Sequence, residues 1–519
     1  MSDRDPFPTP PPGEPSPALE GAGPAALLEA VRALRARVAE EGRAGFRRWR
    51  PAIRRPGFAA GALNLAHYLA LRRRGLWPLQ RGLMRHGLSS LGRLEGRVLA
   101  TLDAVAGALA PLAGEGTPGP AWPPPPRRFF RGEARLRDEA EALFGPAPAG
   151  REGRILVTLP AEAAEDPAWL LDLARRGLDA VRINCAHDDA AAWAAMAAHA
   201  RAAARAVGRP IPVLMDLAGP KLRTGAVHPP EGAARLRPGD ALLLRPDPPR
   251  AGPADPPLQA QCLPPEVLRR LRPGAAFAYD DGKAAGVVEA ARPDGTVLVR
   301  IERGRLKGAR LRPEKGLNFP GTPLGLDPLT PKDLADLDTV ARLADIVGYS
   351  FVQRPADIAR LQEELAARRP ADWRRIGLLA KIETLQAVRD LPGIIVRAAG
   401  SQPFGVMIAR GDLAVEIGFA RLAEMQEEIL WLCEAAHIPV VWATQVLEAL
   451  VKTGLPTRGE MTDAAMAARA ECVMLNKGPN IAAAIEALDG LLRRMAEHQA
   501  KKTPRLRALR SWAEAPGGA

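Results

Sequence analysis

The sequence predicts an α/β protein organised around a TIM-type (β/α)8 barrel, with a small all-β domain inserted into the barrel and a helical extension before it. From residue 154 onward, eight short apolar runs alternate with helical stretches, which is the pattern of a parallel barrel. After the third run the pattern changes to short alternating segments rich in Pro and Gly. A chain of 519 residues, 47% of them hydrophobic, can bury the large core that such a fold needs.

The composition narrows the class of protein. The four cysteines lack the pair spacing of a disulfide or zinc framework, which predicts reduced thiols in a cytoplasmic protein. The start of the chain has no apolar signal-peptide core, and the apolar stretch 57–71 is interrupted by Asn64 and His67, so no membrane association is expected. The net charge of +13 permits binding of phosphorylated metabolites or nucleic acid and does not choose between them.

The region before the barrel shows helical periodicity and several arginine clusters, at residues 47–50, 54–55 and 72–74. These clusters are compatible with a nucleic-acid or membrane-surface patch, but solvated helix faces or salt bridges to the barrel explain them more simply. A proline-rich linker and a short helix near residues 133–143 follow. Because the linker intervenes, the sequence predicts a barrel that stays soluble and active without the helical region. The alternative is that apolar helix faces of that region pack on the barrel.

The eight predicted strands share a buried apolar stretch, and most of them end in a polar residue. In such barrels the active site lies at the carboxyl ends of the strands, where these polar residues would meet. The predicted strands are residues 154–159, 180–185, 212–217, 345–351, 377–383, 405–412, 439–445 and 472–478.

The insertion after the third strand is typical of a small antiparallel β domain. Its Tyr279-Asp280-Asp281-Gly282 segment predicts a tight turn, for which a plain hairpin is a sufficient explanation. The predicted organisation is a disordered Pro-rich tail (1–18), a helical N-terminal region (19–113), a linker with a short helix (114–150), the first part of the barrel (151–225), the inserted β domain (226–312), which we call the lid, the second part of the barrel (313–498) and a basic tail (499–519).

Two neighbouring strands end in residues suited to a divalent metal site. Glu383 and Asp412 would emerge at the same rim, and two hard carboxylate oxygens favour Mg²⁺ or Mn²⁺. Lys381 adds an ammonium beside them, so the site would stabilise negative charge on a phosphoryl group or an enolate. The structural alternative is a solvated Lys381–Glu383 pair and a helix N-cap at Asp412.

Longer motifs extend this interpretation. The segments MDLAGPKLRTG, EKGLNFPG, AKIET, MIARGDLAVEIG and WATQVLEAL, the last followed by PTRGEMTD, occur in this order between about residues 154 and 495. On these motifs, which span about two thirds of the chain, the sequence resembles the pyruvate kinase family.

The resemblance implies phosphoryl transfer from phosphoenolpyruvate to ADP with Mg²⁺ or Mn²⁺ as cofactor. It assigns Arg182 to the substrate phosphate, Lys381 to the phosphoryl group in transfer, and Thr444 to the carbon that is protonated. The implied sites are Lys381, Thr444 and Arg182 for catalysis; Arg182, Gly411, Asp412 and Thr444 for substrate; Asn184, His187, Arg223 and Lys315 for nucleotide; Glu383 and Asp412 for the divalent metal; and Asn184, Asp216 and Lys221 for a monovalent cation or its substitute.

The chain departs from the family pattern at positions that bear on cations and nucleotide. Ala186 replaces a serine that helps to hold a monovalent cation, and Lys221 replaces the glutamate of potassium-requiring members. The Lys221 ammonium can supply the missing charge, so K⁺ is not expected to be required. Residues 476–480 replace a family loop on the nucleotide side, which leaves the phosphoryl acceptor open.

Three functions remain open from the sequence. The preferred one is a pyruvate kinase whose partners are phosphoenolpyruvate and ADP or ATP. A metal-dependent aldolase or lyase acting on a pyruvate enolate could use the same carboxylates, although Lys381 and the lid argue against it. A non-catalytic regulator with a basic, anion-binding head is disfavoured by the intact site residues. Nucleic acid is not an expected partner, and a homo-oligomer is compatible with the sequence.

Overall fold

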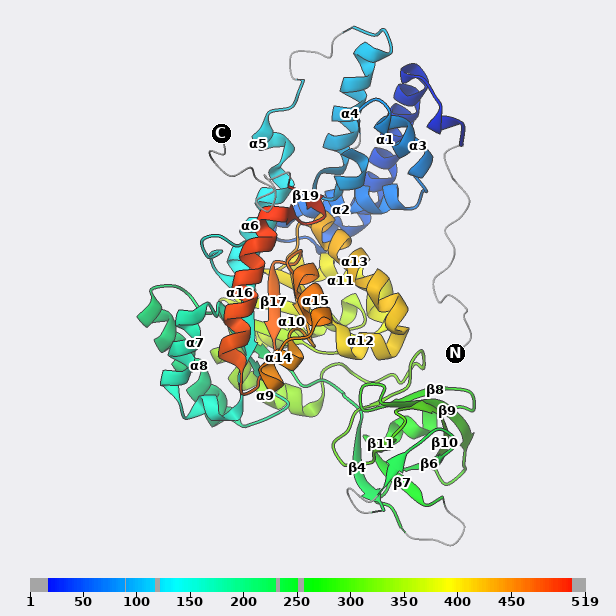
Figure 1. The fold of residues 1–519 in the computed structure, drawn as a ribbon, viewed down its shortest axis with the longest axis vertical. Helices are drawn as coiled ribbons and strands as arrows, with labels where there is room; N and C mark the ends of the chain where they lie inside the picture. Colours follow the sequence, from blue (N-terminus) through cyan, green and yellow to red (C-terminus); the bar gives the residue numbers. More distant parts are fainter. Residues whose placement is uncertain (1–16, 89, 117–121, 230–233, 251–255, 506–519) are drawn as a thin grey trace, which may run out of the picture.

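A closed barrel of eight parallel strands forms the centre of the computed structural model, which describes residues 17–88, 90–116, 122–229, 234–250 and 256–505 (Figure 1). All eight predicted strands form, and β17 closes on β1, so the predicted fold class is confirmed. The strands are β1 (Arg154–Thr158), β2 (Ala180–Asn184), β3 (Val213–Asp216), β13 (Ile346–Tyr349), β14 (Gly377–Ile382), β15 (Phe404–Ala409), β16 (Val440–Ala443) and β17 (Cys472–Leu475).

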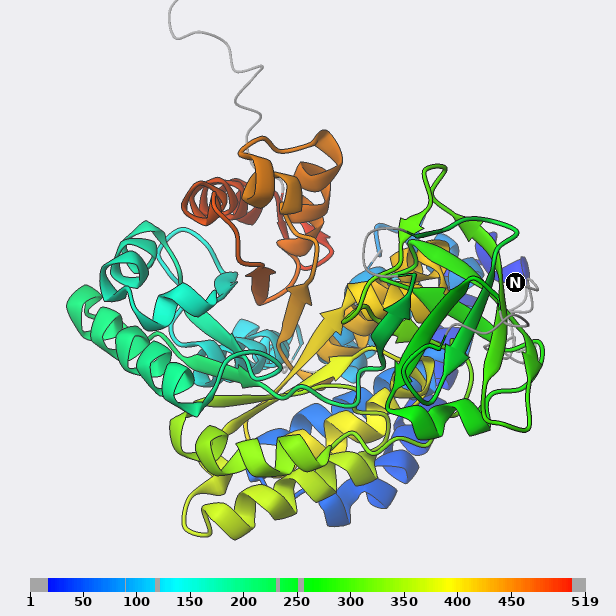
Figure 2. The same cartoon turned by 90° about the horizontal axis from the view of Figure 1, so that it is seen from below.

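Helices follow the strands and surround the barrel (Figure 2). They are α7 (Pro167–Arg176), α8 (Ala190–Val207), α9 (Pro331–Leu343), α10 (Pro355–Arg368), α11 (Leu385–Ala399), α12 (Arg410–Ile417), α13 (Phe419–Ala436), α14 (Glu448–Thr453), α15 (Arg458–Ala467) and α16 (Ile481–His498). None of the described helices has the length and apolar character needed to cross a bilayer.

The parallel register brings the carboxyl ends of the strands to one rim. Thr158 on β1 pairs in register with Arg182 on β2, and Asn184 on β2 pairs with Asp216 on β3. Lys381 lies near the end of β14, level with the buried end of β15. Residues far apart in the sequence therefore meet at the rim where parallel barrels carry their active sites.

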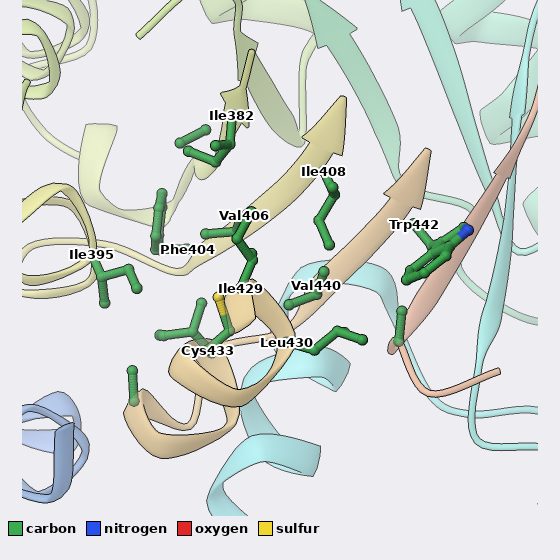
Figure 3. Close-up of a cluster of buried hydrophobic side chains, with 14 of the residues drawn as sticks. Ile382, Ile395, Phe404, Val406, Ile408, Ile429, Leu430, Cys433, Val440 and Trp442 are labelled. Atoms are coloured by element: carbon green, nitrogen blue, oxygen red, sulfur yellow. The ribbon is translucent and has the colours of Figure 1, made fainter. Parts of the chain in front are cut away.

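Apolar side chains fix these strands from outside and inside. Between β15 and the outer helices, Phe404, Val406 and Ile429 pack together with other buried side chains (Figure 3). Inside the barrel, Met407 of β15 belongs to a second buried cluster, which Phe144 of helix α6 joins. Because successive residues of a strand point to opposite faces, one strand contributes to both clusters.

The lid is an all-β domain beside the barrel rim, joined to it after β3 (Figure 1). One sheet has the order β12-β8-β9-β10-β6-β7-β4, and β5 pairs separately with β11. Its strands extend slightly beyond the predicted range 226–312 on both sides. They are β4 (Arg223–His228), β5 (Arg235–Leu236), β6 (Ala241–Arg245), β7 (Leu258–Leu263), β8 (Ala276–Tyr279), β9 (Ala284–Ala291), β10 (Val297–Gly304), β11 (Ala309–Arg310) and β12 (Leu317–Asn318).

The N-terminal region is a helical head that lies against α13 of the barrel (Figure 1). Most of the predicted tail 1–18 lies outside the described residues; Pro17 and Ala18 begin a short 3-10 helix, Pro17–Glu20. The head and the segment after it contain α1 (Pro24–Trp49), α2 (Ala59–Arg72), α3 (Trp77–Met84), α4 (Val98–Leu112), α5 (Pro126–Phe129) and α6 (Arg131–Phe144), with a 3-10 turn at Glu95–Arg97.

The linker does not keep the head apart from the barrel, because helix faces of the head pack on it. Buried side chains of the head and of the barrel helices form one continuous apolar cluster. Asn64 on α2 donates hydrogen bonds to Glu95 O at 2.7 Å and to Ala435 O of α13 at 2.8 Å. A Cβ atom on Gly132 of α6 would lie 2.0 Å from Gly96 O, so only glycine permits this approach. The head therefore packs against the barrel and shares one apolar core with it.

The arginine clusters supply part of this junction. Arg55 Nη2 lies 2.5 Å from Glu139 Oε1 of α6, and Arg74 pairs with Glu41 inside the head. Arg72 places its guanidinium 5.0 Å from the ring centroid of Trp431 on α13. None of these three contacts is a salt bridge to the barrel itself. Arg55 binds the segment before the barrel, Arg74 pairs inside the head, and Arg72 packs on the barrel helix α13.

The predicted basic tail begins as a folded hairpin. Strands β18 (Gln499–Ala500) and β19 (Thr503–Pro504) pair directly after α16, while residues 506–519 lie outside the described part. Lys501 pairs with Glu471 of the barrel, Lys502 pairs with Glu95 of the head, and Arg505 Nη2 lies 2.9 Å from Glu152 Oε1. We call residues 499–505 the basic clasp, because its cations join three parts of the chain.

Candidate active site

Lys381 lies at the centre of a polar cluster at the carboxyl rim of the barrel. Its ammonium donates a 2.7 Å hydrogen bond to Ser350 Oγ and lies 3.1 Å from Glu383 Oε1 and 3.3 Å from Asp216 Oδ2. Burial disfavours the charge of Lys381, but Asp216 and Glu383 outweigh it and raise the pKa of Lys381 above its ordinary value. Lys381 therefore keeps its charge at neutral pH.

Asp216 holds a second cation beside Lys381. Its Oδ2 accepts hydrogen bonds from Arg182 through Nε, at 2.8 Å, and through Nη2, while Arg182 Nη1 donates to Thr158 Oγ1 at 3.2 Å. Burial would raise the pKa of Asp216, but Lys381 and Arg182 lower it below the ordinary value. One buried carboxylate thus fixes two cations side by side, which leaves positive charge for an anionic ligand.

Glu383 and Asp412 form the anionic part of the cluster. Glu383 is 3% exposed, and its Oε2 accepts a 2.6 Å hydrogen bond from Phe351 N. Burial raises the pKa of Glu383, Lys381 lowers it and the nearby Asp412 raises it again, with the result above the ordinary value. Two carboxylates that repel each other in a buried site are stabilised by a cation, so this donor set fits Mg²⁺ or Mn²⁺.

The metal site would have few protein ligands. In the part of the chain that the structure describes, no group of three or more His, Cys, Asp or Glu side chains gathers around one point. A divalent ion held by Glu383 and Asp412 would take its other ligands from water and substrate, as Mg²⁺ commonly does.

Lys221 contacts Asp412, one of the two carboxylates that would hold the metal. Its Nζ donates a 2.9 Å hydrogen bond to Asp412 Oδ1 and lies 4.0 Å from Asp281 Oδ1 in the lid turn. Its ion pairs therefore join it to Asp412 and Asp281, whereas the sequence grouped it with Asn184 and Asp216. Burial lowers the pKa of Lys221, but Asp412 outweighs burial and raises the pKa above its ordinary value.

Thr444 is held in an uncommon backbone conformation directly after β16. Its φ of 63° lies in the left-handed region, which β-branched residues rarely adopt. Arg410 Nε donates to Ala443 O at 2.9 Å, Arg410 Nη2 donates to Thr444 O, and the same guanidinium pairs with Asp463. Thr444 Oγ1 accepts a 3.0 Å hydrogen bond from Gly411 N, so two residues predicted to bind substrate contact each other.

The lid turn reaches the same rim. Gly282, with a φ of 82°, occupies a conformation that favours glycine, and a Cβ atom on it would lie 3.9 Å from Val415 Cγ2 of α12. At the other end of the lid, Gly321 N donates to Glu416 Oε1 at 3.3 Å. The acidic turn thus lies beside α12, whose first turn carries Asp412.

Comparison with known proteins shows which family the chain belongs to. Residues 150–482 match the family model of the pyruvate kinase barrel domain. The chain belongs to the pyruvate kinase family. It is 35% identical over 330 residues to a pyruvate kinase of Methylorubrum extorquens, covering 63% of this chain and 64% of that protein. It is 33% identical over 358 residues to one from Agrobacterium vitis, covering 67% and 69%.

Structural comparison agrees. A crystal structure of a pyruvate kinase from Cryptosporidium parvum matches with a TM-score of 0.59 and 25% identity, covering 68% of this chain and 72% of that one. The chain spans 51% to 65% of the length of the first three curated relatives, so the kinship rests on the barrel and lid region.

The residues predicted to bind nucleotide lie in the turn after β2 and at the lid hinge. Asn184 Oδ1 accepts from Ala186 N at 3.2 Å, and His187 N donates to Asn184 O at 3.0 Å, which closes a turn after β2. Arg223 Nη1 donates to Glu314 O at 3.1 Å, next to Lys315 in the sequence. Lys315 Nζ lies 3.9 Å from Asp280 Oδ1 of the lid turn.

Two residues that the sequence analysis missed join these groups. Burial lowers the pKa of His187, and the charges of Lys477 and Arg223 lower it further, so Lys477 from the altered loop 476–480 lies near the expected nucleotide side. Ser350 accepts from Lys381 and donates to Leu217 O at 2.7 Å. The sequence could have indicated these two residues only by their place in the chain, because both follow barrel strands.

Proposed function

We propose that the protein is an active pyruvate kinase, which transfers a phosphoryl group from phosphoenolpyruvate to ADP and so catalyses a step of glycolysis. The observation that carries the proposal is the buried Lys381 ammonium, 3.1 Å from Glu383 and 3.3 Å from Asp216, beside Arg182. A fixed cluster of cations next to a carboxylate pair is the arrangement that phosphoryl transfer needs, because negative charge spreads over the transferred group.

Each residue would act through its position. Arg182, held by Asp216, would bind the phosphate of phosphoenolpyruvate with its planar fork. Lys381 would neutralise the phosphoryl group as the bond to the enol oxygen breaks and the bond to the ADP oxygen forms. The enolate left behind would take a proton at its methylene carbon, near which the resemblance puts Thr444.

Cations complete the proposal. Glu383 and Asp412 would hold Mg²⁺ or Mn²⁺, which supplies positive charge for the phosphoryl and enolate oxygens. Lys221, 2.9 Å from Asp412, already places an ammonium in the site. We therefore propose that K⁺ is not required.

The nucleotide would bind between the barrel rim and the lid hinge, near Asn184, His187, Arg223 and Lys315. Support comes from the charges gathered there, since Arg223 and Lys477 both act on His187. The four buried free thiols fit a cytoplasmic location, since a reducing compartment preserves them.

The test is a lactate-dehydrogenase-coupled assay of the full chain with phosphoenolpyruvate, Mg²⁺ and a panel of nucleoside diphosphates. We expect pyruvate to form only when a diphosphate is present, with kcat falling at least about 100-fold in Lys381→Met. Folding of that variant needs a separate check, because Asp216 and Glu383 would lose their buried partner. Metal-dependent release of pyruvate from an aldol substrate would support the lyase, and no turnover would support the regulator.

A further inference from the structure

A second cavity lies at the opposite end of the barrel from the candidate active site. It has a volume of about 260 Å³, close to the lower limit for small-molecule sites. Its walls come from the head, helix α6, the start of β1, the loop before β17, helix α16 and the basic clasp. The N-terminal ends of β1 and β17 border it, whereas the site residues occupy the carboxyl ends of the strands.

One side of the cavity is apolar. Leu136 and Ala140 of α6 and Leu492 and Ala496 of α16 line it, and the first three are buried. This surface could pack against a hydrocarbon or aromatic body, and removing such a body from water is favourable. A bare ion would leave it without contacts.

The cavity also contains two arginines that are incompletely paired. Arg154 is 4% exposed, and its guanidinium donates to the carbonyl oxygens of Gly145, at 2.8 and 3.1 Å, and of Glu152, at 2.9 Å. No carboxylate of the described residues forms an ion pair with it. Arg97 pairs with Glu133 through Nη1, while its buried Nε has no hydrogen-bond partner.

Most other charged side chains that line the cavity form ion pairs with one another, except at its exposed edge. Lys501 pairs with Glu471 and Arg505 with Glu152, whereas Arg137 on the exposed rim has no ion pair among the described residues. A buried cation, Arg154, and a cationic rim therefore leave the cavity with excess positive charge, and burial of Arg154 away from water makes a matching anion favourable.

Glu434 at the end of α13 is the one lining carboxyl among the described residues without a side-chain partner. Burial raises its pKa to about 7, with Lys501 and Lys502 opposing the shift and Glu95 and Glu471 adding to it. In its protonated form it presents an O–H donor to the cavity, and in its ionised form it would repel an anion.

We propose that this cavity is a binding site for a small organic anion, with a carboxylate that pairs with Arg154 and an apolar body that packs against α6 and α16. The proposal does not depend on the chemistry of the barrel rim. Because the walls belong to head, barrel and basic clasp, a bound anion would stabilise their junction.

The test uses isothermal titration calorimetry of the full chain with benzoate and, as its neutral isostere, benzamide. We expect one benzoate per chain with a Kd of about 1 mM or lower, and at least tenfold weaker binding of benzamide. Inorganic phosphate, which carries charge without an apolar body, should also bind at least tenfold more weakly. Equal affinity for benzoate and benzamide would overturn the proposal.

Variants assign the binding to this cavity. Ala496→Phe should fill it and abolish benzoate binding, whereas Ala483→Phe, on an exposed position of the same helix, should leave the Kd unchanged. Arg154→Met should weaken binding at least tenfold. If that variant does not fold, Glu434→Gln provides a second measurement, with benzoate binding tightened severalfold at pH 8. Unchanged binding in Ala496→Phe, or weaker binding in Glu434→Gln, would contradict the site.

Discussion

Arg410 holds Thr444 in a conformation that threonine rarely adopts, by binding the carbonyl oxygens of Ala443 and Thr444. Arg410→Lys keeps the charge but loses the planar fork. We expect kcat to fall at least about tenfold, because Thr444 is proposed to act on the substrate and small displacements of such a group are costly. Steady-state kinetics with phosphoenolpyruvate measures this, and KM should change less than kcat.

Arg374 provides a matched control. Its guanidinium lies 4.7 Å from the ring centroid of Trp373, much as that of Arg410 lies 4.8 Å from Trp442. Arg374→Lys should leave kcat unchanged. Equal losses in both lysine variants would show that the carbonyl contacts of Arg410 do not position Thr444.

The Lys221 ammonium is the reason why we expect the reaction rate not to depend on K⁺. The rate of the unmodified chain should differ less than about twofold between KCl and tetramethylammonium chloride, because the ammonium beside Asp412 is always present. Lys221→Met should lose at least about tenfold in rate, equivalent to about 1.4 kcal/mol of transition-state stabilisation, and regain part of it in KCl. Lys307→Met, at an exposed lid position, is the control. A tenfold activation of the unmodified chain by K⁺ would refute the prediction.

At the residue scale, the sequence predicts the ends of strands well and contacts across the rim poorly. Lys381, Glu383 and Asp412 could be placed at one rim because a polar residue after an apolar run has one location in a parallel barrel. The hydrogen bond from Lys381 to Ser350 and the contact of Lys221 with Asp412 depend on how separate strands and loops approach after the barrel closes. No local pattern encodes that approach.

Helix α13 ends against the head in a pH-sensitive contact. His437, with a φ of 58°, places Nε2 2.9 Å from Gly96 O, and burial lowers its pKa to about 4. The unfolded chain binds this proton near pH 6.5. The stability contribution of the neutral ring is therefore complete above about pH 6.5 and is lost as the pH falls towards 4, by up to about 3 kcal/mol.

The variant His437→Asn tests that contribution, since asparagine tolerates the left-handed conformation. We expect the melting temperature of the unmodified chain to fall more steeply between pH 7 and pH 4.5 than that of the variant. Calorimetry at several pH values measures the difference. Parallel curves would show that His437 does not titrate differently in the folded and unfolded states.

The basic clasp makes a prediction of its own. Glu95 is 2% exposed and pairs with Lys502, while its Oε2 has no hydrogen-bond partner. Lys502→Met should therefore lower the free energy of unfolding by about 3 kcal/mol, because it leaves a buried carboxylate unpaired. Adding Glu95→Gln should restore most of the loss. Arg505→Ala, which removes a largely exposed pair with Glu152, should cost less than about 1 kcal/mol.

At the element scale, long periodic segments were predictable and short ones were not. The eight barrel strands and α16 follow from apolar runs and helical spacing. The strands of the basic clasp are two residues each and carry no apolar pattern. Their conformation depends on Glu471, Glu95 and Glu152, which lie far away in the sequence.

The whole molecule should not tolerate removal of the head. A variant lacking residues 1–124 would expose the face of α13 that α2 covers, together with the apolar cluster that head and barrel share. We expect this variant to aggregate or to lack measurable activity. Size-exclusion chromatography and the coupled assay are the measurements.

Supplying the head as a separate chain gives the control for that deletion. Coexpression of residues 1–124 with residues 125–519 should recover a one-to-one complex with activity, because the interface consists of packing and hydrogen bonds such as those of Asn64. A fully active, monodisperse barrel without the head would contradict the prediction. The sequence suggested such independence because a proline-rich linker is visible in it, whereas burial of helix faces is visible only in the folded chain.

Strand β1 is the first barrel strand to be made and its neighbour β17 is the last barrel strand, yet the two pair along their length. On the ribosome, the nascent chain therefore carries the head and all other barrel strands before the closing strand emerges. Until then, the edges of β1 and β16 stay available for wrong partners. The interval between synthesis of β1 and of β17 is when this chain is most exposed to misassembly, and the basic clasp can lock the product only afterwards.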